Sequence, residues 1–114
     1  MTREYVVELG GGPMDLDRLR RAFGELMDKA AHDVQCAGYE QDDSIVERYV
    51  DLRYEGEKTS LCIEVQSLSD ETRLLHPFHT AHERQFGKSF PQRPVEMLSA
   101  RAKCLVYGQP QKPI

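Results

Sequence analysis

Three histidines offer the clearest chemistry in this sequence. His76, His79 and His82 follow one another at steps of three residues, and imidazole nitrogens are common zinc ligands. Steps of three do not return to one line of a helix with about 3.6 residues per turn, so a single ion could not take all three without strain. A zinc site would instead combine two of them with another ligand, for which the candidates are Glu83, Cys62 and Cys104.

The same histidines also fit a structural role. His82 would pack and hydrogen-bond from the inner face of a helix, His76 would cap that helix, and His79 would be exposed. Zinc enzymes of the zincin type space their histidines by four, with a glutamate beside the first, which is not the spacing here. We therefore favour the structural role and assign no metal ligands, no catalytic residues and no cofactor-binding residues.

Cysteines and carboxylates form no complete catalytic constellation in the sequence. Cys36, Cys62 and Cys104 stand apart, without a Cys-x-x-Cys spacing, which predicts buried free thiols and no disulfide. Asp51 and Arg53 lie two residues apart in a strand-like segment. We therefore expect them to share a strand face as a surface ion pair.

The composition is typical of a soluble globular domain. The chain has 114 residues, of which 39% are hydrophobic and 30% charged, and a chain of this length can build a core without disulfides. The formal net charge is −4 without a basic run, so we expect no nucleic-acid partner. No stretch has the apolar length of a membrane helix, and the first residues lack the apolar middle of a signal peptide. We expect a single cytoplasmic domain over residues 1–114.

A long helix is the strongest local pattern. Asp15 is suited to its N-cap and Gly38 to the left-handed position after its end. Such a helix is roughly 30 Å long at about 1.5 Å per residue, so it must lie across a broad sheet. The apolar residues at steps of three and four form one stripe: Leu16, Leu19, Phe23, Leu26, Ala30, Val34 and Ala37.

Three segments alternate apolar and polar residues, as strands with one buried face do. They are residues 45–54, 61–65 and 95–107, and a hairpin around Gly56 joins the first two. Residues 5–9 predict a further marginal or edge strand, and the glycines at 10–12 a flexible link, because no Lys-Ser or Lys-Thr follows them as in a phosphate loop. In the last strand we expect one face to carry Leu98, Ala100, Ala102, Cys104 and Val106.

A shorter helix is expected between the second and third of these strands. Proline is tolerated in a first helical turn, so Pro77 places the start near His76 and the end at Gly87, with Phe78, Ala81 or His82, and Phe86 facing inward. The predicted fold class is α+β, with an antiparallel sheet of three to four strands packed against one long and one short helix. Residues 108–114 form a proline-rich tail.

Several motifs keep a common order along the chain. The long helix ends in Ala37-Gly38, a hairpin follows with Asp51-Leu52-Arg53-Tyr54 and Gly56, then come Phe78-x-x-x-His82-x-x-x-Phe86-Gly87, Val95-Glu96 and Arg101. This order resembles the C-terminal module of the family of hydantoinase A, 5-oxoprolinase and acetone and acetophenone carboxylase. The resemblance spans residues 16–107, and we take 14–107 as the module. The chain departs at Glu57, where members of the family usually carry glutamine.

The resemblance implies a role beside larger proteins. In this family ATP and Mg²⁺ are bound by a much larger N-terminal part, whose glycine-rich motifs this sequence lacks. A stand-alone module looks most like the small (gamma) subunit of the hetero-oligomeric acetophenone carboxylase, which implies a structural, non-catalytic subunit bound to larger ATPase-like subunits. The expected contact residues lie on the sheet and the tail, and they are Tyr49, Arg53, Tyr54, Tyr107, Pro110 and Pro113.

Two other functions stay open from the sequence. One is an independent metal-dependent hydrolase that uses the three histidines. The other is a small binding module whose sheet and helices enclose a ligand pocket. The sequence also leaves open the substrate and stoichiometry of an assembly, the face that meets a partner, and whether His82 reaches a partner's active site.

Overall fold

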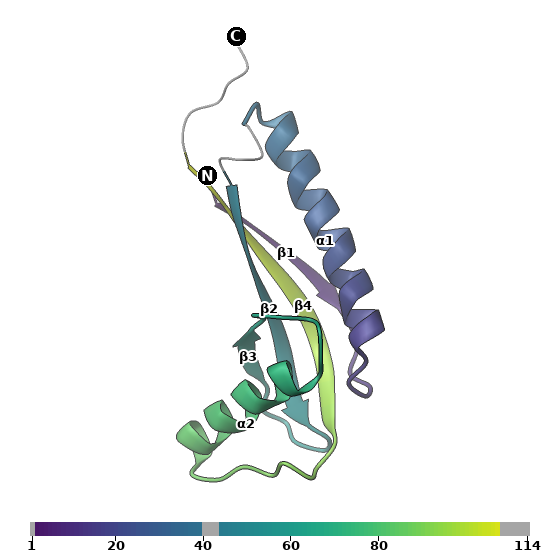
Figure 1. Cartoon of the computed structure of the whole chain (residues 1–114), viewed down its shortest axis with the longest axis vertical. Coiled ribbons are helices and arrows are strands. Elements are labelled where there is room, and N and C mark those ends of the chain that lie inside the picture. The colour runs from purple at the N-terminus through teal and green to yellow at the C-terminus, as the bar shows by residue number, and fades with distance from the viewer. Residues whose placement is uncertain (1, 40–43, 108–114) are drawn as a thin grey trace.

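The computed structural model describes residues 2–39 and 44–107. Four strands form one antiparallel sheet in the order β1-β4-β2-β3, and two helices lie against it (Figure 1). This α+β arrangement confirms the fold class predicted from the sequence. The elements are β1 (Thr2–Glu8), α1 (Leu16–Cys36), β2 (Ser44–Tyr54), β3 (Leu61–Glu64), α2 (Thr72–Phe86) and β4 (Val95–Val106).

Helix α1 begins and ends where the sequence predicts. The side chain of Asp15 accepts hydrogen bonds from the backbone N–H groups of Asp17 and Arg18, which satisfies donors that the first turn leaves unpaired. After the helix, Gly38 adopts a positive φ of 88°, a conformation that favours glycine. The predicted stripe faces the sheet, and its buried members are Leu19, Phe23, Leu26, Ala30 and Val34. Ala22, which the stripe did not include, is also buried, whereas Ala37 is exposed.

Strand β4 contains an irregularity that the alternation pattern missed. Asp51 of β2 pairs with Ser99, but the next residue, Leu52, pairs with Met97, so Leu98 is an extra residue on β4. A β-bulge of this kind shifts the alternation by one residue. The prediction that Leu98 shares the inner face is therefore wrong, and Met97 takes that place with no exposed surface.

Helix α2 starts earlier than predicted. It begins at Thr72, and Pro77 lies inside it, so His76 is within the helix and does not cap it. The first turn is secured because Asp70 Oδ1 accepts from the Thr72 N–H at 2.7 Å and because Leu74 is fully buried. This burial outweighs the backbone hydrogen bond that proline cannot donate. Phe86, which we expected to face inward, is 42% exposed.

Both helices pack on the same face of the sheet. Residues of both contribute to one core together with Val50, Tyr54 and Ala100. The loop that leads to α2 runs on this side as well, since Arg20 of α1 donates to the carbonyl oxygen of Leu68 at 2.6 Å. No described helix or loop covers the opposite face, which we call the open face.

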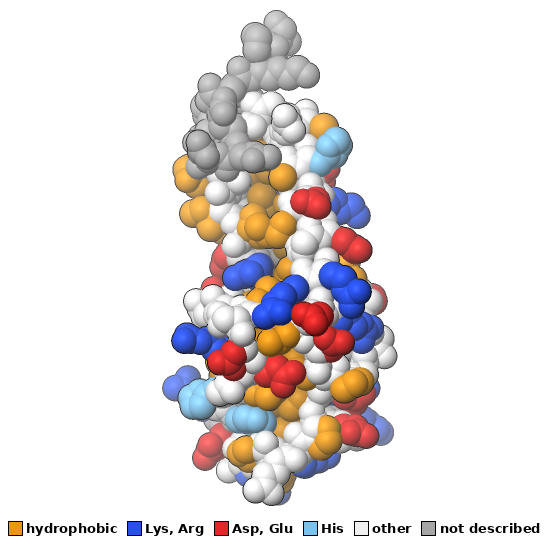
Figure 2. Space-filling model, turned by 45° about the vertical axis from the view of Figure 1, so that its right-hand side comes forward, with side chains coloured by type: hydrophobic (Ala, Val, Ile, Leu, Met, Phe, Trp, Pro, Cys, Tyr) orange, Lys and Arg blue, Asp and Glu red, His pale blue; other side chains and the backbone are white. Residues whose placement is uncertain are grey.

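Neither described helix has the length and apolar character needed to cross a bilayer. On the side that carries α1, acidic and basic side chains are interspersed around apolar patches (Figure 2).

Candidate functional site

The residues that could do chemistry meet where α2 packs on the hairpin of β2 and β3. Tyr54, at the end of β2, is fully buried. Its ring contacts Phe78 and His82, with centroid distances of 4.9 and 4.8 Å. We call this group, with His79, Phe90 and Glu57, the tyrosine–histidine cluster. Because Tyr54 lies in the core, the prediction that it is an interface residue is wrong.

The hydroxyl of Tyr54 links α2 to the loop that follows it. The Phe90 N–H donates to the hydroxyl oxygen at 2.8 Å, which leaves the hydroxyl proton to donate to Nδ1 of His79 at 2.6 Å. His79 is thus partly buried and not solvent-exposed as predicted. Burial first, and then the nearby His76 and His82, lower the pKa of His79. A neutral imidazole is the form that can accept the tyrosine proton.

His82 lies deeper in the same cluster, with 4% of its surface exposed. Its Nδ1 bonds to the carbonyl oxygen of Lys88 at 2.7 Å, and its Nε2 lies 3.3 Å from Oε2 of Glu57. Oε1 of Glu57 in turn lies 3.4 Å from Nη1 of Arg93. The packing position inferred for His82 agrees with this geometry, and Glu57 connects it to the loop before β4.

The hydrogen bonds of the tyrosine–histidine cluster hold α2 against the β2–β3 hairpin and the loop that follows α2. The polar atoms of Tyr54 and His82 are committed to partners within the cluster. Among residues 2–39 and 44–107, no group of three or more histidine, cysteine, aspartate or glutamate side chains could hold a metal ion.

A cavity lies beside His79 of the cluster. It has a volume of about 230 Å³ and is lined by Pro13, Met14, residues of α2 that include His79, and the segment from Pro91 to Val95. This is small compared with the roughly 300 to 1,000 Å³ of most ligand pockets.

The open face holds a second group of polar residues. Asp51 accepts from Nε of Arg101 at 2.9 Å and also from the Ser99 hydroxyl, while Arg53 donates to Glu96 at 3.3 Å. The expected ion pair between Asp51 and Arg53 is therefore wrong, because each binds a residue on β4. Cross-strand neighbours are closer than residues two apart on one strand.

The glutamate on the open face also fastens the glycine link. The Gly12 N–H donates to Oε2 of Glu96 at 3.2 Å. This bond, and then the charge of Arg53, lower the pKa of Glu96. The link predicted from the glycines is present, but it is bound to β4 through Glu96 and Met97 and is not the flexible segment that we expected.

The other predicted contact residues are distributed unevenly. Tyr49 lies on the open face, partly buried, where its hydroxyl donates to Glu47 at 2.8 Å. This bond raises the pKa of Tyr49 to about 12. Tyr107 is 53% exposed just after β4. Pro110 and Pro113 lie outside the described residues.

The cysteines are free thiols, and only Cys104 is buried. The prediction of buried thiols is wrong for Cys36 and Cys62, which are exposed. Cys36 lies at the end of α1, 3.4 Å from Nε2 of His32. Cys62 pairs with Asp51 across the strands, which places it on the open face, and burial and then the Asp51 charge raise its pKa.

Sequence reasoning missed the links that join distant segments. The bonds of Tyr54 to His79 and Phe90 span 25 and 36 residues. One signal was present, because the alternation of β2 places Tyr54 on the same side as Val50 and Leu52 and therefore toward the core. The partners of Tyr54 had no comparable signal.

Comparison with known proteins gives a sequence relative and several structural matches, two of which are described below. No family model matches the chain. It is 30% identical over 95 residues to 5-oxoprolinase from Saccharomyces cerevisiae (strain ATCC 204508 / S288c), a match that covers 83% of this chain and 7% of that protein.

The fold is shared with two solved structures. The chain matches acetone carboxylase in a nucleotide-free structure with a TM-score of 0.84 and 18% identity, over 97% of this chain and 18% of that one. It matches ATP-dependent caprolactamase from Pseudomonas jessenii with a TM-score of 0.81 and 18% identity, over 99% of this chain and 18% of that one. The sequence match and the shared fold support the resemblance to the C-terminal module of the hydantoinase and oxoprolinase family, of whose large proteins this chain spans a small part.

Proposed function

We propose that this chain is a small structural subunit of a hetero-oligomeric ATP-dependent carboxylase similar to acetophenone carboxylase. Residues 1–114 act as one cytoplasmic module that holds larger subunits together. Those subunits bind ATP and Mg²⁺ and make benzoylacetate from acetophenone and bicarbonate. The similarity to acetone carboxylase and caprolactamase, both ATP-dependent by name, supports this class of assembly.

The observation that carries the proposal is the one-sided packing of the sheet. Tyr54 and the residues around it pack α2 against one face of the sheet. The opposite face has no covering layer among the described residues. A sheet face left open in this way is available for a further protein layer. The relatives supply such a context, because this module is 18% of the chain in each structural match.

Coexpression tests the proposal. The chain would be produced together with any large ATPase-like subunits that the neighbouring reading frames prove to encode, and the purified material would be analysed by mass spectrometry. We expect one complex of fixed stoichiometry whose ATP-dependent carboxylation of acetophenone falls when this chain is omitted. A monodisperse chain that neither associates with those subunits nor changes their activity would contradict the proposal.

The second candidate is a ligand-binding module, for which the cavity beside His79 has room only for a small ligand. A thermal-shift screen of the isolated chain with aromatic ketones and carboxylates separates the two functions, because a ligand that binds the folded state raises the melting temperature. A shift abolished by His79→Gln in a chain that forms no complex would favour the binding module.

A further inference from the structure

The open face carries its side chains in rows that cross the sheet. Strand pairing places Val6, Arg101, Tyr49 and Glu64 directly beside one another on four successive strands. Directly paired residues point to the same face. Val6 is 45% exposed although it is apolar, whereas its neighbours along β1, Tyr5 and Val7, pack against the core. Val6 therefore exposes an apolar side chain among polar ones at the β1 edge of this face, and Arg101 and Tyr49, on the two inner strands, lie at its centre.

Arg101 is held in place at this centre. Its Nε donates to Asp51 at 2.9 Å, and Asp51 is itself only 8% exposed. The Arg101 side chain stays 44% exposed. An arginine that is fixed by a buried carboxylate and still accessible loses little conformational freedom when a partner binds. Such residues are common anchors in protein interfaces.

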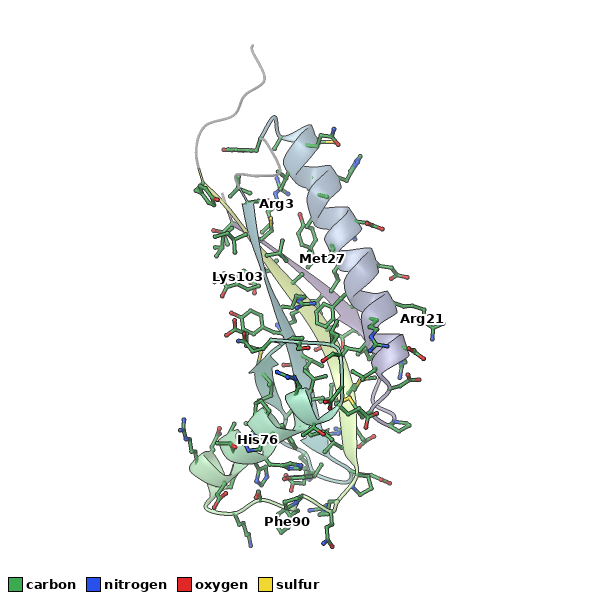
Figure 3. The ribbon with its side chains drawn as sticks, viewed as in Figure 1. Arg3, Arg21, Met27, His76, Phe90 and Lys103 are labelled. Atoms are coloured by element: carbon green, nitrogen blue, oxygen red, sulfur yellow. The ribbon has the colours of Figure 1, made fainter. Side chains whose placement is uncertain are left out.

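The charges around this centre do not cancel. Asp51 and Glu96 are balanced by Arg101 and Arg53, but three exposed glutamates, Glu4, Glu8 and Glu64, form no ion pair with any described residue. Lys103 lies directly between Glu4 and Glu47 and offsets one of these carboxylates. Figure 3 shows Lys103 and Arg21 pointing to opposite sides of the molecule, so this acidic excess lies away from the outer face of α1.

We propose that the open face is the docking surface for a large subunit and that the facing surface of this subunit is basic. This inference rests on the proposed function and adds the chemistry of the partner. Complementary charge gives specificity and speeds association. The face is also large enough for an interface. Its strands have 7, 12, 11 and 4 residues, and with a rise of about 3.3 Å per residue and a strand spacing of about 4.8 Å they cover an area of roughly 500 Å². A standard interface buries about 800 Å² on each partner, so this face supplies the larger part of one.

Charge reversal tests the proposal with a matched control. One variant combines Glu4→Lys, Glu8→Lys and Glu64→Lys on the open face. The control combines Glu25→Lys, Asp28→Lys and Glu83→Lys, which are exposed on the helices and change the net charge equally. Each would be coexpressed with the large subunits of the neighbouring reading frames, and the dissociation constant measured at low and at physiological salt.

The open-face variant should bind at least about tenfold more weakly than the control, and the affinity of the unchanged chain should fall as salt rises. Equal losses in both variants, or no loss in the open-face variant, would overturn the docking surface while leaving the structural subunit intact. Failure of the unchanged chain to bind would overturn the proposed function itself.

A photocrosslinking amino acid keeps the inference testable if the triple variant does not fold. Placed at Val6 it should crosslink to the large subunit, and placed at Arg21 on α1 it should not. Crosslinks from Arg21 alone would overturn the proposal.

Discussion

The two faces of the sheet use alternate residues of the same strands for different purposes. On the inner face Val50, Tyr54 and Ala100 have no exposed surface and hold both helices. On the open face Arg101 and Val6 remain accessible, although the residues beside Arg101 along its strand are buried and those beside Val6 are partly buried. Because a strand turns successive side chains to opposite sides, one segment can specify folding and recognition independently. Mutations on the inner face should therefore change stability, and mutations on the open face should change partner binding.

The inner face should give the largest effect on stability. Phe78→Ala removes a side chain that is 1% exposed and contacts Tyr54. We expect the free energy of unfolding to fall by about 3 to 5 kcal/mol, because the substitution leaves a cavity. Urea denaturation measures this. Tyr49→Ala on the open face is the control, and a loss as large for Tyr49 would remove the distinction between the faces.

Loss of the Tyr54 hydroxyl should lower the free energy of unfolding by less than loss of the Phe78 ring. Tyr54→Phe keeps the packing but leaves the Phe90 N–H and the His79 Nδ1 without their partner. The expected loss is about 1 to 3 kcal/mol, the cost of buried unsatisfied polar groups. Hydrogen exchange of the Phe90 amide should accelerate in parallel. An unchanged exchange rate would show that this hydrogen bond does not hold the loop.

The glycine link can be tested by a pair of substitutions. Gly11 has a φ of +83°, and an added Cβ would lie 3.3 Å from Oε2 of Glu96. Gly11→Ala should therefore cost about 1 to 2 kcal/mol. In the middle of α1, Gly24→Ala meets no atom within 4 Å and should stabilise by about 0.5 to 1 kcal/mol. Thermal unfolding measures the change in stability of each variant. If both variants were stabilised or both destabilised, the difference in backbone conformation between Gly11 and Gly24 would not explain the result.

His79 of the tyrosine–histidine cluster should make the stability of the fold depend on pH. Since the folded pKa of His79 lies below the usual value of 6.5, the unfolded chain binds more protons there than the folded one. Stability is complete above about pH 6.5 and is lost as the pH falls toward the folded pKa. His79→Gln should flatten the melting-temperature profile between pH 7.5 and about 5.5. A profile that keeps its slope would assign the effect to another group.

A second pH effect should occur in a lower range. The pKa of Glu96 is also lowered, but for a carboxylate the associated stability is present above its unfolded pKa near 4.5 and is lost as the pH falls through the folded value. Glu96→Gln should reduce acid sensitivity below about pH 4.5 and leave the histidine range unchanged. Loss of slope in both ranges would mean that the two groups are coupled.

Local signals predicted one part of the fold well. Asp15 and Gly38 mark the ends of α1 chemically, and the apolar stripe between them is regular, so both bounds follow from neighbouring residues. The alternation in β2 likewise separates inner from outer residues. These features depend on contacts within a few residues of each other, which a sequence displays directly.

Other features depend on contacts between distant segments. The bulge at Leu98 arises from the pairing of β4 with β2, and the early start of α2 depends on the burial of Leu74. The partners of Tyr54 and Asp51 come from a helix, a loop and a strand that lie far along the chain. Periodicity carries no information on such pairings, and the candidate site consists mainly of them.

The chain carries its own probes for the central claim that the open face binds a partner. Cys62 is an exposed thiol on this face, Cys36 is an exposed thiol on α1, and Cys104 is buried. The rate of maleimide labelling at each thiol should be measured with and without the large subunits at one pH. If the open face binds the large subunits, they should slow labelling of Cys62 and leave the labelling of Cys36 unchanged. Unchanged labelling of Cys62 in the intact complex would contradict it.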